Sequence, residues 1–234
     1  MRGKIILIEG TDCSGKQTQT EALVRRLSAD GIRVEKMSFP MYETPTGKIV
    51  GGPYLGKEHI SECWFKEGAN NVDPKVASLY YAADRKYNIS KIEKLLDDGV
   101  TIILDRYTPS NMAHHGGKIS NKEERLAFYK WIDTLEYKLL ELPQPDYAYL
   151  LYMPYEAGQQ LRNSRIKTEK LDEHEKSEAN LRNAEAAYLE IAEIYNFEVI
   201  NCVKDNEIRT IEDINNELYD NLISKLDMQN KKTH

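Results

Sequence analysis

A phosphate-binding loop is the most specific chemical feature of the sequence. Gly10 is followed after four residues by Gly15 and Lys16, and the four residues before Glu9 are all apolar. Glycines let backbone amides converge on phosphate oxygens, and a helix that begins at the end of the loop directs its positive end toward them. Lys16 adds a mobile positive charge for the outer phosphates of a nucleotide. The residues expected to hold these phosphates are Gly10, Thr11, Asp12, Cys13, Ser14, Gly15, Lys16, Gln17 and Thr18.

The residue after Lys16 departs from the usual pattern of such loops. Serine or threonine ordinarily follows the lysine and binds a magnesium ion, whereas Gln17 follows it here and Thr18 comes next. The amide oxygen of Gln17 is a suitable ligand for a hard cation, and a water molecule in its place is the alternative. Gln17 is therefore one candidate magnesium ligand.

Charged residues also follow the apolar segment over residues 100–104, which is expected to be a buried strand. Asp105 and Arg106 come directly after it. Because ligands bind outside the carboxyl ends of the strands in an open parallel sheet, both residues are expected at the same edge as the loop. Asp105 there can hold magnesium through water, and Arg106 can clamp a phosphate with two hydrogen bonds. The alternative is an ion pair that only closes the end of the strand.

Tyr81 and Arg85 lie one turn apart on an expected helix that begins at Asp73 and Pro74 and ends at Asp98. Residues four apart share one face of a helix. An aromatic ring and a guanidinium on one face can hold a flat base by stacking and by hydrogen bonds. The alternative, which the spacing alone favours, is an aromatic core residue beside a surface arginine.

Apolar runs and alternation predict strands over residues 5–8, 32–38, 100–104, 147–152 and 197–203, with helices between them. Ser120 and Glu123 form a capping box that is expected to start a helix ending at Glu141, and Thr210 is expected to cap a last helix ending at Leu226. This alternation predicts an α/β chain in which helices cover both faces of a five-stranded parallel sheet. With the phosphate-binding loop after the first strand, we expect a three-layer P-loop NTPase fold. The residues expected on the buried faces of the two middle helices are Leu79, Ala82, Ala83, Ile89, Ile92, Leu95 and Leu96, and Trp131, Ile132, Leu135, Leu139 and Leu140.

Two segments lack a regular pattern. Residues 41–71 are expected to hold a short helix near Gly47 and then a long loop, which is either functional or a tolerated surface insertion. A mixed-charge run over residues 165–176 follows a helix that carries Arg162 and Arg165; it is either a solvated face or a lid that closes basic residues onto phosphates. We expect one domain over residues 1–227, with a mobile lid over about 162–176 and a disordered polar tail over 228–234.

Composition and charge restrict the partners and the compartment. The 234 residues include 32 basic and 38 acidic side chains, and the net charge of −6 is unfavourable for a nucleic-acid-binding protein. Cys13, Cys63 and Cys202 are odd in number and widely spaced, which predicts neither a disulfide framework nor a zinc site, and the adjacent His114 and His115 lack the spacing of a metal-binding pair. The chain starts without a signal-peptide pattern, and no apolar stretch is long enough to span a membrane. We therefore expect a cytoplasmic protein with no nucleic-acid or membrane partner.

Together these motifs resemble the thymidylate kinase family of P-loop nucleoside monophosphate kinases. The resemblance covers about residues 4–226. The segments that carry it are Glu9-Gly10-x-Asp12-x-x-Gly15-Lys16, Phe39-Pro40, Leu79-Tyr80-Tyr81-Ala82-Ala83-Asp84-Arg85, Asp105-Arg106-Tyr107 with Ser110, Leu142-Pro143-x-Pro145-Asp146, and Arg162 and Arg165 with Asp172-x-x-Glu175.

The resemblance implies transfer of the γ-phosphate of ATP to dTMP, which gives dTDP for dTTP synthesis, with Mg²⁺ as cofactor and a homodimer as the assembly. It implies that Tyr81 stacks on the base and that Arg85 bonds its edge. The catalytic residues that it implies are Lys16, Arg106, Arg162 and Arg165. The acceptor-binding residues that it implies are Asp12, Phe39, Pro40, Tyr81, Arg85, Arg106, Tyr107, Ser110, His114 and His115.

Four further residues differ from common members of that family. Cys13 stands where some members have an arginine, and the resemblance implies that such members take the arginine from the lid. Tyr42 stands where many members have an arginine, and His114-His115 replace an aromatic and a polar residue near the base and sugar. The alternative functions are a kinase for another deoxynucleotide or for a deoxynucleoside, with Glu9 as the candidate general base, and a nucleotide switch without transfer chemistry.

Overall fold

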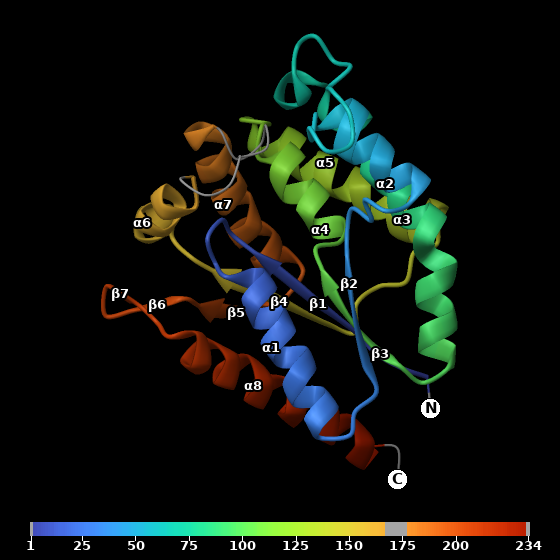
Figure 1. The fold of residues 1–234 in the computed structure, drawn as a ribbon, viewed down its shortest axis with the longest axis vertical. Coiled ribbons are helices and arrows are strands. Elements are labelled where there is room, and N and C mark those ends of the chain that lie inside the picture. Colours follow the sequence, from blue (N-terminus) through green and yellow to red (C-terminus); the bar gives the residue numbers. More distant parts are fainter. Residues whose placement is uncertain (1, 167–176, 233–234) are drawn as a thin grey trace.

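The central element is a parallel sheet whose middle strands are buried on both faces. The computed structural model describes residues 2–166 and 177–232, with side chains over 2–163 and 177–226. The sheet has the order β2-β3-β1-β4-β5 (Figure 1). Its strands are β1 (Ile5–Gly10), β2 (Val34–Ser38), β3 (Thr101–Asp105), β4 (Tyr147–Tyr152) and β5 (Glu198–Asn201). The prediction of five parallel strands is confirmed.

Helices cover both faces of this sheet, so the three-layer prediction is also confirmed. Leu23 of α1 (Lys16–Ala29) and Leu218 of α8 (Ile211–Lys232) pack on one face, against Ile6 and Leu151. The other face is covered by α3 (Pro74–Asp97), α5 (Lys122–Asp133) and α7 (Glu178–Ile194). Because β1 and β3 contact helices on both sides, their sequences are continuously apolar rather than alternating.

The register of the sheet brings the chemical residues to one edge. Ile8 on β1 is level with Asp105 on β3, and Ser38 at the end of β2 is level with the same aspartate. The phosphate loop leaves β1 two residues after Ile8. The loops after β1, β2 and β3 therefore meet at the carboxyl edge of the sheet, where ligands bind in this class of fold.

Short helical segments complete the chain. The segment over residues 41–71 packs partly on α3: Val50, Tyr54, Leu55 and Ala69 form a small buried cluster with Val72 and Ala77. The fifth predicted strand is divided, because β5 ends at Asn201 and a two-stranded antiparallel ribbon follows. The remaining elements are α2 (Pro45–Ile49), η1 (Val50–Tyr54), η2 (Ala69–Asn71), α4 (Thr108–Asn111), η3 (Met112–Gly116), η4 (Thr134–Leu139), α6 (Tyr155–Ile166), β6 (Val203–Lys204) and β7 (Glu207–Ile208).

Several details of the helices differ from the predictions. Asn121 caps α5, since its side chain accepts from the backbone N–H of Glu124, so the capping box at Ser120 was wrong by one residue. Leu139 is exposed because the π-helical segment η4 changes the number of residues per turn and so rotates the later side chains. Leu79 and Ala83 are exposed because polar side chains take the buried face of the first half of α3.

The two ends of the predicted domain can be compared with the described residues. The last helix α8 continues to Lys232, into the segment expected to be a disordered tail. Most of the expected lid, residues 167–176, lies outside the described residues. Within the described part, each helix is too short or too polar to cross a bilayer.

Candidate functional site

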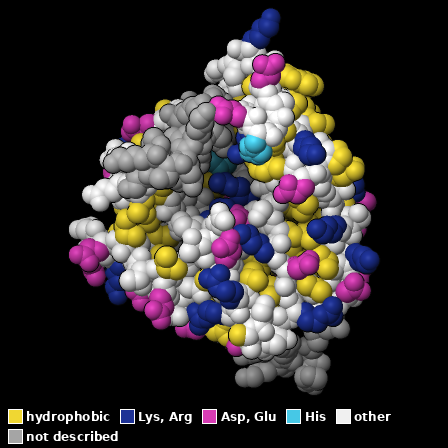
Figure 2. Space-filling view, in the orientation of Figure 1, with side chains coloured by type: hydrophobic (Ala, Val, Ile, Leu, Met, Phe, Trp, Pro, Cys, Tyr) yellow, Lys and Arg dark blue, Asp and Glu magenta, His cyan; other side chains and the backbone are white. Residues whose placement is uncertain are grey.

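Two adjoining cavities open at the carboxyl edge of the sheet. The first has a volume of about 870 Å³ and is lined by the phosphate loop and the loop after β2. The second, of about 100 Å³, lies between α3, α4 and η3. The residues that line both are Phe39, Pro40, Tyr42 and Arg106. Figure 2 shows the hollow in this face, with lysine and arginine side chains inside it, so positive charge is concentrated locally in an acidic chain.

The phosphate loop has the backbone that the sequence predicts. Gly15 has φ +69° and Cys13 has φ +59°, so the chain turns through two left-handed residues before α1 begins at Lys16. The Thr11 hydroxyl donates to the carbonyl of Met153 and accepts from its N–H, both at 2.8 Å, which fixes the loop to the end of β4. All the predicted loop residues except Gly10 line the first cavity. Gly10 lies behind them, where an added Cβ would lie 2.4 Å from the Ser14 hydroxyl.

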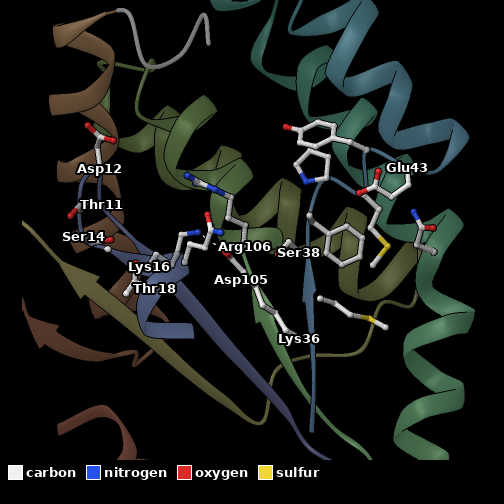
Figure 3. Close-up of a pocket in the computed structure, with 18 of the residues that line it drawn as sticks. Thr11, Asp12, Ser14, Lys16, Thr18, Lys36, Ser38, Glu43, Asp105 and Arg106 are labelled. Atoms are coloured by element: carbon white, nitrogen blue, oxygen red, sulfur yellow. Dashed lines mark hydrogen bonds and ion pairs between the residues drawn. The ribbon is translucent and has the colours of Figure 1, made fainter. Parts of the chain in front are cut away.

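Lys16, Asp105 and Arg106 lie together at the ends of β1 and β3 (Figure 3). The Lys16 ammonium donates a hydrogen bond to Asp105 Oδ1. Burial and the neighbouring Arg106 lower the pKa of Lys16 to about 8, although Asp105 acts in the opposite direction. Two cations are therefore held close together beside one carboxylate, an arrangement that favours the arrival of an anion.

Arg106 is held in an unusual backbone conformation. Its φ is +67°, in the left-handed region that residues other than glycine rarely adopt. Its side chain lies 3.2 Å from the imidazole of His114, between Arg106 Nη1 and His114 Nε2. Sparse conformations of this kind cluster at functional sites. The conformation directs a cation to the wall that the two cavities share.

Glu9 is fully buried close to Lys16 and Arg106. Its carboxylate accepts from the backbone N–H of Tyr107 (2.9 Å), the Ser110 hydroxyl (2.8 Å) and the Tyr188 hydroxyl (3.1 Å). Burial raises the pKa of Glu9, although Arg106 and Lys16 act to lower it. Glu9 therefore holds the loop that follows β3 and is already engaged by three donors.

The second cavity brings together the aromatic and polar residues that the sequence picked out. Tyr81, Arg85, Ser110, His114 and His115 all line it. The Tyr81 ring lies 5.6 Å from that of His115, measured between centroids. Arg85 is only 2% exposed, so it is not a surface arginine, and it lines this cavity together with Tyr81.

The loop after β2 forms the wall between the cavities. Phe39 and Pro40 are joined by a cis peptide bond, and Phe39 packs on Tyr107 with ring centroids 5.7 Å apart. Asp84 of α3 is buried and accepts from the Met41 N–H at 2.9 Å and from the Thr46 hydroxyl at 2.8 Å. Asp84 therefore fixes this wall to the helix that carries Tyr81 and Arg85.

The side of the site toward α6 carries one of the predicted lid arginines. Arg162 donates from Nε to Asp12 Oδ2 at 2.6 Å, and its guanidinium lies 4.1 Å from the centre of the Tyr155 ring. Its Nη1 and Nη2 atoms are buried and have no hydrogen-bond partner among the described residues. Arg165 also belongs to α6, but its side chain lies outside the described part of the chain.

Comparison with known proteins gives the family. The family model for thymidylate kinase matches residues 8–214. The chain belongs to the thymidylate kinase family. A probable thymidylate kinase from Saccharolobus solfataricus is 32% identical over 206 residues, which is 88% of this chain and 92% of that protein. Human thymidylate kinase is 32% identical over 152 residues, 65% of this chain, and the match spans less than two thirds (62%) of the human protein.

A solved structure has the same fold as this member of the thymidylate kinase family. A thymidylate kinase from Candida albicans superposes with a TM-score of 0.70 at 24% sequence identity, over 96% of this chain and 92% of that one. The resemblance that the sequence motifs indicated is therefore confirmed at the level of family and of fold.

The two candidate magnesium ligands lie at the first cavity. Gln17 and Asp105 both line it. Gln17 donates through Nε2 to Glu21 at 3.0 Å, so its amide oxygen is the atom available to a cation. Mg²⁺ keeps several waters and needs only one or two protein oxygens together with phosphate oxygens. The chemistry of Gln17 and Asp105 therefore fits Mg²⁺. A metal site built from three or more His, Cys, Asp or Glu side chains does not occur among the described residues.

Two polar residues of this site were not predicted from the sequence. The Tyr188 hydroxyl, on α7, lies 3.1 Å from Glu9 and 3.2 Å from the Ser110 hydroxyl. Glu136 is buried behind the second cavity and pairs with Arg85. Local sequence patterns could indicate neither of these contacts, because the partner residues are tens of residues away in the chain.

Proposed function

We propose that this protein transfers the γ-phosphate of ATP to the phosphate of dTMP, giving dTDP and ADP. The observation that carries the proposal is the pair of cavities with Arg106 in their shared wall. One cavity contains a complete phosphate-binding loop, and the other combines Tyr81 with Arg85 in the manner expected of a base pocket. Two nucleotides that meet at Arg106 would have their phosphates adjacent, which is the requirement for direct transfer between them.

Positioning and neutralisation of charge account for the catalysis. Lys16 and the loop amides hold the β- and γ-phosphates of ATP, and Arg106 orients the acceptor phosphate. The acceptor is already an anion at neutral pH, so the reaction needs no general base. Phosphoryl transfer of this kind depends mainly on alignment and on charge stabilisation around the transferred group. Arg162, anchored to the phosphate loop through Asp12, is the described lid arginine closest to that role.

Asp105 and Gln17 are the residues that would hold magnesium. When bound, the ion neutralises charge on the donor phosphates. Asp105 also holds the Lys16 ammonium in place, so the same carboxylate organises two positive charges around the phosphates.

The alternative kinases and the switch are less well supported. A deoxynucleoside kinase requires a free general base for the 5′-hydroxyl proton, and Glu9 already accepts from three donors. A nucleotide switch needs only one binding site, whereas the second cavity lies next to the first and is lined by its own aromatic and basic side chains.

The assembly and location belong to the same proposal. We place the reaction in the cytoplasm, since Cys13, Cys63 and Cys202 are all free thiols. A homodimer is the expected assembly by family resemblance. Light scattering of the purified protein tests the mass, and a monomer at micromolar concentration would contradict the dimer.

A direct assay tests the activity. The purified protein is incubated with magnesium-ATP and separately with dTMP, dUMP, dCMP, dGMP and thymidine, and ADP and the product are quantified. The expected result is ADP formation with dTMP in a one-to-one ratio to dTDP, and none in a matched Lys16→Met variant. Stronger activity with thymidine than with dTMP, or no acceptor-dependent ADP, would contradict the proposal.

A further inference from the structure

Glu136 is a buried carboxylate that the proposed reaction does not use directly. It is fully buried and lies on the π-helical segment η4 that follows α5. Its oxygens accept hydrogen bonds from Arg85 Nε, from Arg85 Nη2 (2.6 Å), from the Thr108 hydroxyl (2.9 Å) and from Asn111 Nδ2 (3.1 Å). The Glu136 carboxylate therefore accepts four hydrogen bonds from side chains of α3 and α4.

The geometry of this pair determines how Arg85 can act. Glu136 takes the Nε and Nη2 side of the guanidinium, and the Nη1 donors are not used in that pair. Arg85 and Asn111 line the second cavity, whereas Glu136 is not among the described residues that line it. The Glu136 carboxylate thus holds the Arg85 guanidinium from the side away from the second cavity. A two-point contact also prevents rotation of the guanidinium plane.

Stability alone is a weak explanation for this arrangement. Removing two charges from water costs several kcal/mol per ion, and apolar residues of similar size often stabilise a core as well as a buried ion pair does. Burial lowers the pKa of Arg85, but the attraction and hydrogen bonds of Glu136 outweigh it, so the pKa is raised and the arginine stays charged. The pair thus maintains a cation next to a small cavity.

The local backbone is a second, independent observation. Glu136 occurs where the helix that begins as α5 changes to π-helical turns over Thr134–Leu139. Such turns are rare and occur frequently at functional sites. The change of turn is also what leaves Leu139 exposed, so at this position the chain places a carboxylate inside and a leucine outside.

We propose that Glu136 is a positioning residue that fixes Arg85 as a rigid donor to a carbonyl oxygen on the edge of the acceptor base. This inference rests on the proposed function. A guanidinium has only donors. It therefore matches the 4-carbonyl of thymine or uracil and opposes the 4-amino group of cytosine. The orientation imposed by Glu136 makes that distinction sharp, because a guanidinium free to rotate would tolerate either base.

The test is the selectivity of a Glu136→Gln variant among dTMP, dUMP and dCMP at saturating ATP. We expect the KM for dTMP to rise about 10- to 100-fold, with the KM for ATP unchanged. The ratio of kcat/KM for dTMP over dCMP should fall about 10-fold or more, whereas the ratio of dTMP over dUMP should stay constant, because both bases have the same carbonyl.

A matched control separates positioning from stability. Glu190 makes the same two-point contact with Arg125, at 2.8 Å and 3.2 Å, outside both cavities. Glu190→Gln should lower the melting temperature without changing the dTMP to dCMP ratio. If Glu136→Gln does not fold, Thr108→Val removes a single bond to Glu136 and should lower the same ratio about 2- to 5-fold.

A double-mutant cycle tests the route of the effect. If Glu136 acts only through Arg85, Glu136→Gln should add no further loss of dTMP selectivity in an Arg85→Gln background. An unchanged ratio in Glu136→Gln, or additive losses in the double variant, would overturn the inference. Wild-type protein that fails to phosphorylate dTMP would contradict the proposed function instead, so the two failures are distinguishable.

Discussion

Arg162 Nε lies 2.6 Å from Asp12 Oδ2, so the helix that precedes the charged segment is fastened to the phosphate loop. Both side chains are largely buried, and the Arg162 guanidinium also lies over the ring of Tyr155. The loop has Cys13 next to this aspartate and so lacks an arginine of its own. The ion pair places a cation from α6 beside the position that Cys13 leaves uncharged.

Replacement of this arginine should affect turnover more than binding. We expect Arg162→Ala to lower kcat about 10³-fold, because an arginine supplied to a transferring phosphoryl group contributes on that order. The KM for ATP should change by less than about fivefold. Steady-state kinetics with ATP and dTMP provide the measurement, and Asn163→Ala, an exposed neighbour on the same helix, is the matched control.

The comparison with Arg165 decides which lid arginine acts. Arg165→Ala is expected to lower kcat more than it weakens ATP binding if it shares this role. An Arg162→Ala variant with wild-type kcat, beside an impaired Arg165→Ala variant, would assign the chemistry to Arg165 and contradict the assignment to Arg162.

The affinity for ATP should fall at alkaline pH. Burial lowers the pKa of Lys16 to about 8 in the free protein, so the charged form dominates below that pH and is lost above it. Because only the charged form attracts the phosphates, the Kd for ATP should rise about tenfold per pH unit above about 8. Calorimetric titrations from pH 6.5 to 10 measure this directly.

Two variants test whether the loss of ATP affinity at alkaline pH comes from Lys16. Arg has a far higher pKa than Lys, so any ATP binding that remains in Lys16→Arg should be independent of pH up to 10. The pKa of Lys118 is also lowered to about 8 by burial, but Lys118 lies outside both cavities. Lys118→Gln should therefore leave the profile unchanged; a profile that flattens in this variant instead would refute the role given to Lys16.

Arg106 should control the acceptor rather than the donor. We expect Arg106→Ala to raise the KM for dTMP about 10- to 100-fold, which corresponds to the loss of hydrogen bonds to a charged phosphate. The Kd for ATP, measured without acceptor, should decrease or stay constant, because the neighbouring Lys16 loses a repelling charge. An unchanged KM for dTMP would show that Arg106 does not contact the acceptor.

Thiol reagents should inhibit through Cys13. This cysteine is partly exposed and lines the first cavity, whereas Cys202 is buried and burial raises the pKa of its thiol to about 12. Bound ATP should slow the inactivation by N-ethylmaleimide about tenfold, as expected when ligand covers the thiol at about ten times its Kd. A Cys63→Ala variant should behave as the wild type, and inactivation that ATP does not slow would place Cys13 away from the nucleotide.

Local patterns in the sequence predicted most of the fold and the phosphate loop. Strands buried on both faces, such as β1 and β3, give continuous apolar runs. The glycine spacing of the loop directly indicates a backbone that can bend around a phosphate. The position of Asp105 and Arg106 followed from a general rule about strand ends. These features depend on residues near one another in the chain.

The base pocket depended on contacts that local patterns do not contain. The buried face of the first half of α3 carries Ser78, Asp84 and Arg85, so the apolar period was right for Ala82 but wrongly placed Leu79 inside. Arg85 can be buried there only because Glu136, 51 residues later, neutralises it. A pattern with a period of 3.6 residues also cannot anticipate the π-helical turns that place this glutamate.

The left-handed backbone conformation of Arg106 lowers thermal stability, whereas the proposed phosphate transfer needs the arginine side chain at this position. At φ +67° a glycine would fit without strain, so Arg106→Gly is expected to relieve about 1 kcal/mol of conformational strain while it removes the cation between the two cavities. Selection of this chain for heat resistance alone should therefore enrich glycine at position 106 and yield stable proteins that no longer transfer phosphate. An arginine there is retained only while catalysis is under selection.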